Sequence, residues 1–184
     1  LAEDGIATIV DHGVEEADDV QLELARKRQL VAAADGLTVP IKPTAVADGA
    51  MLRALADLIQ QAPEPDAARL DGDLVERLSD AHREQFDDAV EGLVRLARDA
   101  EAAGGALLLD AEMTDLQPAV DRLFLSVLER WAAESDKAFA TYAHRPTRPG
   151  PALYNTYQCY LSGSEARLAL DAAAAKDLGV AFGA

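Results

Sequence analysis

The chain has 184 residues and a formal net charge of −16 at pH 7. This acidity repels phosphate backbones and anionic membrane surfaces, so it argues against nucleic-acid binding, and no apolar stretch approaches the ~20 residues of a membrane-spanning helix. The single cysteine, Cys159, excludes a disulfide within the chain, and we expect its thiol to be packed. These properties favour a small-molecule site.

Short apolar runs of the kind that form buried strands recur along the chain. They cover residues 7–10, 37–41, 106–109, 152–154 and 180–184. The first four each end on a polar residue, in order Asp11, Lys42, Asp110 and Asn155. Polar residues at the ends of apolar strands are typical of parallel α/β sheets that carry a site at their carboxyl edge.

Helical patterns separate these runs. We expect helices over residues 20–34 and 165–177, a helix that starts after a Ser79 cap and ends near residue 103, and a helix over 118–131 with an apolar stripe. Glycines at 36, 104–105 and 179 stand where a left-handed helix end needs them. Residues 61–73 and 141–151 are rich in proline or glycine and are expected to form surface loops.

The alternation of strands and helices predicts an α/β fold with a parallel sheet. A full (β/α)8 barrel needs about 250 residues, so this length accommodates about the first five strands. We therefore expect residues 1–184 to be a fragment of one barrel domain, a partial (β/α)8 TIM-like barrel. A complete small α/β protein with five strands is the alternative.

The residues at the strand ends carry the candidate chemistry. Lys42 needs an anion, which a ligand or an ion pair with Asp11 or Asp110 could supply. Asp110 suits acid–base work, or it bonds backbone donors of its own loop while Glu112 is solvated. Asn155 offers a donor and an acceptor to a polar ring, although amides also hold loops in place. The sequence has neither a glycine-rich phosphate loop nor metal-ligand spacing, so we predict no metal site.

Two motifs closely resemble the proline dehydrogenase family: LLLDAEMTDLQP at 107–118 and LYNTYQCYL at 153–161. The runs IATIVDHGVE at 6–15 and VPIKPTA at 39–45 resemble the first two strands of the same family. The run at 155–160 resembles the eukaryotic type most specifically. The resemblance implies the amino-terminal half of a distorted barrel that binds FAD without a Rossmann unit.

The resemblance also implies an oxidoreductase. Such enzymes oxidise L-proline to Δ1-pyrroline-5-carboxylate by hydride transfer to the flavin and pass the electrons to a quinone. By similarity, Lys42 helps to neutralise the substrate carboxylate and Asp110 lies beside flavin and substrate, so both are expected to be catalytic, with Asp110 also binding the cofactor. Asn155 is expected to contact the flavin ring, so we expect Lys42, Asp110 and Asn155 to share one cavity. Asp11 is a weaker match, and Glu112 and Gln158 match the pattern without an assigned role.

Two other functions stay open from the sequence. Hydroxyproline dehydrogenases have similar motifs, and a half-barrel could serve as a non-catalytic binding module. The resemblance to eukaryotic-type enzymes implies a mitochondrial location. Because the substrate-clamping arginines of the family come later than residue 184, we expect this segment alone to be inactive.

Overall fold

The computed structural model describes residues 9, 11–15, 17–139, 150–181 and 183–184. Its elements, in chain order, are α1 (Val20–Ala33), β1 (Thr38–Ile41), α2 (Pro43–Val46), α3 (Gly49–Gln60), α4 (Pro65–Ala68), the 3-10 helix η1 (Gly72–Arg77), α5 (Asp80–Ala102), β2 (Ala106–Leu109), α6 (Gln117–Phe139), β3 (Leu153–Asn155) and α7 (Ser164–Asp177). Strands and helices alternate as the sequence predicts, so the fold is a mixed α/β fold.

The centre of the fold is a parallel sheet of three strands in the order β1-β2-β3. Isolated parallel bridges extend it on both sides, from Ile9 to Thr38 and from Tyr154 to Gly183. The three central strands confirm the strand predictions at 37–41, 106–109 and 152–154 to within one residue. The two outer predicted strands are represented only by these bridges, and most of the run at 7–10 lies outside the described residues.

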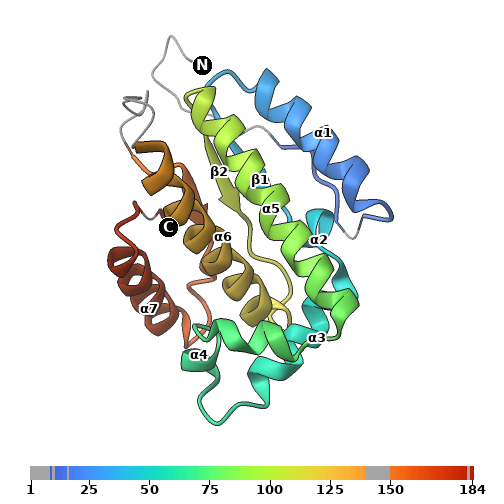
Figure 1. Ribbon diagram of the computed structural model, residues 1–184, viewed down its shortest axis with the longest axis vertical. Helices are drawn as coiled ribbons and strands as arrows, with labels where there is room; N and C mark the ends of the chain where they lie inside the picture. Colours follow the sequence, from blue (N-terminus) through green and yellow to red (C-terminus); the bar gives the residue numbers. More distant parts are fainter. Residues whose placement is uncertain (1–8, 10, 16, 140–149, 182) are drawn as a thin grey trace.

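Four helices form a layer against the sheet. In Figure 1, α1, α5, α6 and α7 lie side by side; α1 contacts β1, α5 contacts β2 and α6 contacts β3. The apolar stripe expected over 118–131 is buried: Leu123 and Phe124 of α6 are at most 1% exposed. Full burial of such side chains contributes ~1.5–3 kcal/mol each, which fastens this layer to the sheet.

The two faces of the sheet differ in cover. Side chains alternate along a strand, and the set that includes Val39, Ile41, Leu107 and Leu109 is at most 3% exposed and belongs to the main core. On the other face, Leu108 and Tyr154 are only half-buried, whereas Pro40 and Ala106 are buried. The helix layer therefore covers one face, and the other face is the more open one.

The helix ends follow the predicted chemistry. Gly36, Gly104 and Gly179 have φ values of 84°, 76° and 70°, as left-handed helix ends require. The Ser79 side chain accepts a hydrogen bond from the His82 N–H, which confirms it as the cap of α5.

The structure corrects two expectations. The stretch 61–73 is not only a surface loop, because it contains α4 and its Arg69 is 1% exposed. The hydrogen bonds of this arginine to α7, described below, account for its burial. Cys159 is exposed rather than packed, because it lies in the loop between β3 and α7. Most of the predicted loop at 141–151 lies outside the described residues.

Candidate functional site

Lys42 and Asp110 meet at the carboxyl edge of the sheet. Each directly follows its strand, and the backbone N–H of Asp110 still donates to the carbonyl of Ile41, at 2.9 Å. The Lys42 Nζ lies 2.6 Å from Asp110 Oδ2, and the two side chains are 22% and 32% exposed. Asp110 Oδ1 accepts a hydrogen bond from the N–H of Ala111 at 2.9 Å. The ion pair left open by the sequence therefore forms, within reach of solvent and of a ligand.

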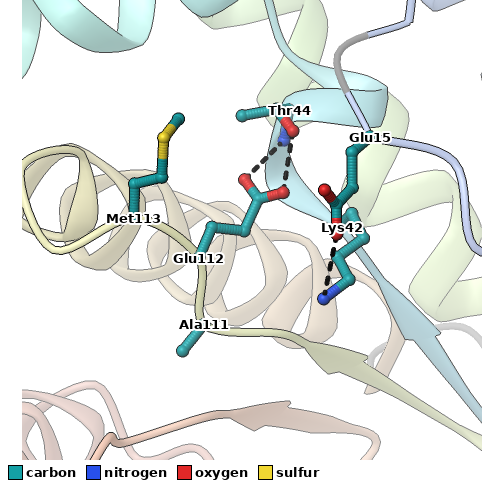
Figure 2. A pocket seen from close by; sticks show the side chains of 6 residues that line it. All are labelled: Glu15, Lys42, Thr44, Ala111, Glu112 and Met113. Atoms are coloured by element: carbon teal, nitrogen blue, oxygen red, sulfur yellow. Dashed lines mark hydrogen bonds and ion pairs between the residues drawn. The ribbon is translucent and has the colours of Figure 1, made fainter.

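A pocket of about 470 Å³ opens beside this ion pair. Its lining residues are Glu15, Lys42, Thr44, Ala111, Glu112 and Met113. Figure 2 shows the Glu15 carboxylate next to the Lys42 ammonium, and Glu15 Oε1 lies 3.7 Å from Lys42 Nζ. Glu15 is a site residue that the sequence did not reveal, because it lies beyond the end of the first apolar run.

Glu112 joins the loops that follow β1 and β2. Its Oε1 accepts a hydrogen bond from the Thr44 hydroxyl at 2.7 Å, and its Oε2 accepts one from the Thr44 N–H at 3.0 Å (Figure 2). Glu112 is half-buried and Thr44 is 4% exposed. The alternative that Glu112 is merely solvated is therefore wrong.

The environment of the pocket shifts the pKa of two of its groups. The hydrogen bond to Asp110 raises the pKa of Lys42 above 10.5, against the opposing effect of partial burial, so Lys42 is charged at neutral pH. Burial raises the pKa of Glu112 above 4.5, while the hydrogen bonds from Thr44 and the nearby Lys42 charge act in the opposite direction. The pocket thus pairs a fixed cation with a carboxyl group that ionises less readily than usual.

Gln158 brings the loop after β3 to the same region. Its Nε2 donates to the backbone carbonyl of Glu112 at 3.0 Å. Its Oε1 is buried and has no hydrogen-bond partner within the described part of the chain. A buried amide oxygen without a partner is costly, so this atom is a candidate acceptor for a ligand N–H.

Asn155 does not join Lys42 and Asp110. It lies in register with Leu109 and Ile41, whose side chains face the helix layer, whereas Lys42 and Asp110 occupy the next position along and so face the other way. Its Nδ2 donates to Asp121 of α6 at 3.4 Å and its Oδ1 accepts from the Thr156 N–H at 3.0 Å.

These contacts of Asn155 differ from the expectation that three strand-end side chains share one cavity. A contact from Asn155 to the flavin therefore stays a prediction that these hydrogen bonds do not favour. Asp11 is also placed apart, because its Oδ1 accepts a hydrogen bond from Lys27 Nζ at 3.3 Å rather than from Lys42.

A buried polar cluster lies next to the loop that follows β3, between α4, α6 and α7. Asp171 is fully buried, pairs with the Arg69 guanidinium and accepts a hydrogen bond from the Tyr157 hydroxyl at 2.6 Å. Arg167 Nε lies 2.9 Å from Asp121 Oδ2. This cluster fixes the segment after β3 against the helices.

None of the helices in the described part of the chain is long and apolar enough to cross a membrane. The described residues contain no group of three or more His, Cys, Asp or Glu side chains that could hold a metal ion.

Parallel strands in chain order, a covering helix layer and a charged pocket at the carboxyl edge define an α/β protein with a candidate small-molecule site. A family model described as proline dehydrogenase matches residues 3–184. The chain belongs to the proline dehydrogenase family, as the motifs in its sequence indicate.

Curated relatives come from two groups of enzymes. The chain is 33% identical over 153 residues to hydroxyproline dehydrogenase of Mus musculus, a match that covers 78% of this chain and 31% of the relative. It is 31% identical over 160 residues to hydroxyproline dehydrogenase of Homo sapiens, covering 82% of this chain and 32% of the relative.

The second group consists of proline dehydrogenases. The chain is 31% identical over 111 residues to proline dehydrogenase 1, mitochondrial, of Homo sapiens, covering 60% of this chain and 16% of the relative. The chain thus spans about a third or less of the length of these relatives. No solved structure gave a significant match.

Proposed function

We propose that the protein containing this chain is an FAD-dependent oxidoreductase that converts L-proline to Δ1-pyrroline-5-carboxylate. The observation that carries the proposal is the Lys42–Asp110 pair at 2.6 Å, placed at a pocket at the carboxyl edge of a parallel sheet. Family membership supplies the reaction class. The pocket supplies the charges that this substrate needs.

We propose further that the sheet is part of a (β/α)8 barrel. The strands lie in chain order without reversal, and single bridges at Ile9 and Gly183 continue the parallel sheet on both sides. A singly wound barrel has this order, whereas a doubly wound sheet reverses it. The more open face of the sheet, which carries Leu108 and Tyr154, then corresponds to the barrel interior.

The residues at the pocket fit a flavin ring, which presents both N–H donors and carbonyl acceptors. Gln158 Oε1 is a buried acceptor with no partner within the described residues, and Lys42 is a donor. We propose that Asp110, Lys42 and Gln158 lie beside the ring. When bound, FAD supplies the hydride acceptor that no side chain can provide.

The chain's own residues bind and orient the substrate. Proline carries a carboxylate and a secondary ammonium group, and the pocket region offers a partner for each. Lys42, charged at neutral pH, binds the carboxylate, and Asp110 holds Lys42 in place. The carboxylate of Glu15, which also lines the pocket, favours the ammonium group.

A hydroxyproline substrate is the second candidate. It is favoured by the relatives named hydroxyproline dehydrogenase, which match over 78% and 82% of this chain. We propose a quinone as the electron acceptor from the family resemblance, and a mitochondrial location because the human relative is named a mitochondrial enzyme. A non-catalytic binding module would keep the fold and the pocket but bind no flavin.

The test is to purify the whole protein and measure its flavin content, then its reduction of a quinone analogue with L-proline or hydroxyproline. We expect bound FAD and a higher kcat/KM for L-proline than for hydroxyproline. Bound FAD with a clear preference for hydroxyproline would select the second candidate. Purified, folded protein that contains no flavin and oxidises neither substrate would favour the binding module.

A further inference from the structure

The loops that follow β1 and β2 leave the sheet side by side. Within the sheet, β1 and β2 pair residues that are 68 positions apart, such as Ile41 with Leu109 (109 − 41 = 68). Beyond the strands the same offset joins Lys42 to Asp110 and Thr44 to Glu112. Two side-chain contacts therefore continue the strand register into the pocket.

The second of these contacts is the more buried. Thr44 is 4% exposed, and both its hydroxyl and its N–H donate to the Glu112 carboxylate, at 2.7 and 3.0 Å. Thr44 lies in the first turn of α2, where an N–H has no partner within the helix. Lys42, the N-cap of α2, makes no side-chain capping bond. The Glu112 carboxylate thus takes over the capping of α2 from a neighbouring loop.

Glu112 also contacts the third loop. Its backbone carbonyl accepts the hydrogen bond from Gln158 Nε2 at 3.0 Å, and Gln158 Oε1 has no partner among the residues that the structure describes. One residue therefore links the loops after β1, β2 and β3. Figure 2 shows the Glu112 side chain pointing to Thr44, away from Ala111 of its own loop.

We propose that Glu112 is a positioning residue of the site: its bonds to Thr44 set where Lys42 stands against Asp110, and its carbonyl orients Gln158. The simpler alternative is that these bonds only stabilise the loops. The expected effect on KM rests on the proposed function, whereas the expected effect on the pKa of Lys42 rests on the geometry of the chain alone. Glu112 acts through Lys42 and Gln158 and need not touch the substrate.

The test uses Thr44→Val in the whole protein, because this change removes the hydroxyl hydrogen bond and alters no charge. Displaced Lys42 weakens substrate binding in the ground state and the transition state alike, so we expect KM for L-proline to rise about tenfold with kcat changed by less than about twofold. Thr44→Ser, which keeps the hydroxyl, is expected to restore the parent KM. If Thr44→Val does not fold, Glu112→Asp replaces it, with the same expected rise.

A second measurement does not depend on catalysis. The pKa of Lys42 is read by NMR of ¹³C-methylated lysines, with the Lys42 signal identified by its loss in Lys42→Arg. The hydrogen bond to Asp110 is the main cause that raises this pKa. We therefore expect the pKa of Lys42 to fall in Thr44→Val and to recover in Thr44→Ser.

The matched control is Ser126→Ala. The Ser126 hydroxyl accepts hydrogen bonds from Arg122 at 2.9 and 3.2 Å on α6, away from the residues that line the pocket. This variant also loses bonds to a charged group, and we expect it to leave KM and the pKa of Lys42 unchanged.

Two outcomes would overturn the positioning role. One is a Thr44→Val variant with the parent KM and the parent pKa of Lys42; the other is the same KM rise in Ser126→Ala. If the parent protein oxidises no proline, the proposed function fails, while the lysine titration still decides on the positioning role.

Discussion

The buried Arg69–Asp171 pair should contribute most of the stability of the polar cluster between α4, α6 and α7. Both side chains are at most 1% exposed, and Asp171 also accepts a hydrogen bond from the Tyr157 hydroxyl at 2.6 Å. Replacing Asp171 by Ala leaves the guanidinium of Arg69 buried without its carboxylate. Breaking a buried pair in this way costs about 3–5 kcal/mol, a large share of the ~5–15 kcal/mol that stabilises a typical domain.

The assay is urea unfolding of the whole protein at pH 7, followed by circular dichroism. We expect Asp171→Ala to lower the free energy of unfolding by about 3–5 kcal/mol, and the double variant Arg69→Met/Asp171→Leu to lose less, because it leaves no buried charge. The matched control is Asp115→Ala, which removes an exposed ion pair with Arg53 at 2.9 Å. It should cost less than about 1 kcal/mol.

A decrease of under about 1 kcal/mol in the free energy of unfolding of Asp171→Ala would show that an unpaired Arg69 is not costly. So would a double variant that is less stable than the single one, since the cost would then come from lost packing and not from the charge that remains.

Two further predictions concern stability. A Cβ on Gly105 would lie 2.4 Å from the carbonyl oxygen of Leu37, so Gly105→Ala should lower the free energy of unfolding by about 1–3 kcal/mol. The control is Gly49→Ala, which should not lower it, because a Cβ on Gly49 would have nothing within 4 Å. Equal effects of the two variants in urea unfolding would contradict the close packing at Gly105. Because the folded-state pKa of Glu112 is raised above 4.5, its contribution to stability is complete below pH 4.5 and is lost as the pH rises through the raised value. The free energy of unfolding of the parent minus that of Glu112→Gln should therefore decrease with rising pH across this window, and a difference that is constant from pH 4 to about pH 8 would count against a buried Glu112.

Local patterns in the sequence predicted most of the fold. Apolar runs of four or five residues, preceded by glycine and followed by a polar residue, predicted β1 and β2, because runs of this length are typical of buried strands. The cap at Ser79 and the glycine joints were predictable for the same reason, since each depends on a few neighbouring residues. The helix α4 and the start of η1 were missed because proline and glycine in 61–73 suggested only a loop, and the helices α2 and α3 before this stretch were not predicted either.

The candidate site was predictable where it follows strand register. Lys42 and Asp110 meet because each is the first residue after a paired strand, and the same offset could have joined Thr44 to Glu112. Asn155 was expected in the same cavity, but it still belongs to β3 and its side chain points to α6. A one-residue difference in where a strand ends reverses the face of a side chain, and sequence patterns do not fix strand ends that closely.

Flavin reduction in the whole protein, without oxygen, on addition of L-proline tests whether the pocket beside Lys42 is the substrate site. We expect the visible absorbance of the bound flavin to bleach in the parent, and we expect Lys42→Met to keep the flavin but to need a much higher proline concentration to bleach it. Parent protein whose flavin is not reduced by proline or hydroxyproline, or a Lys42→Met variant that bleaches at the parent concentration, would contradict the assignment of this pocket as the substrate site.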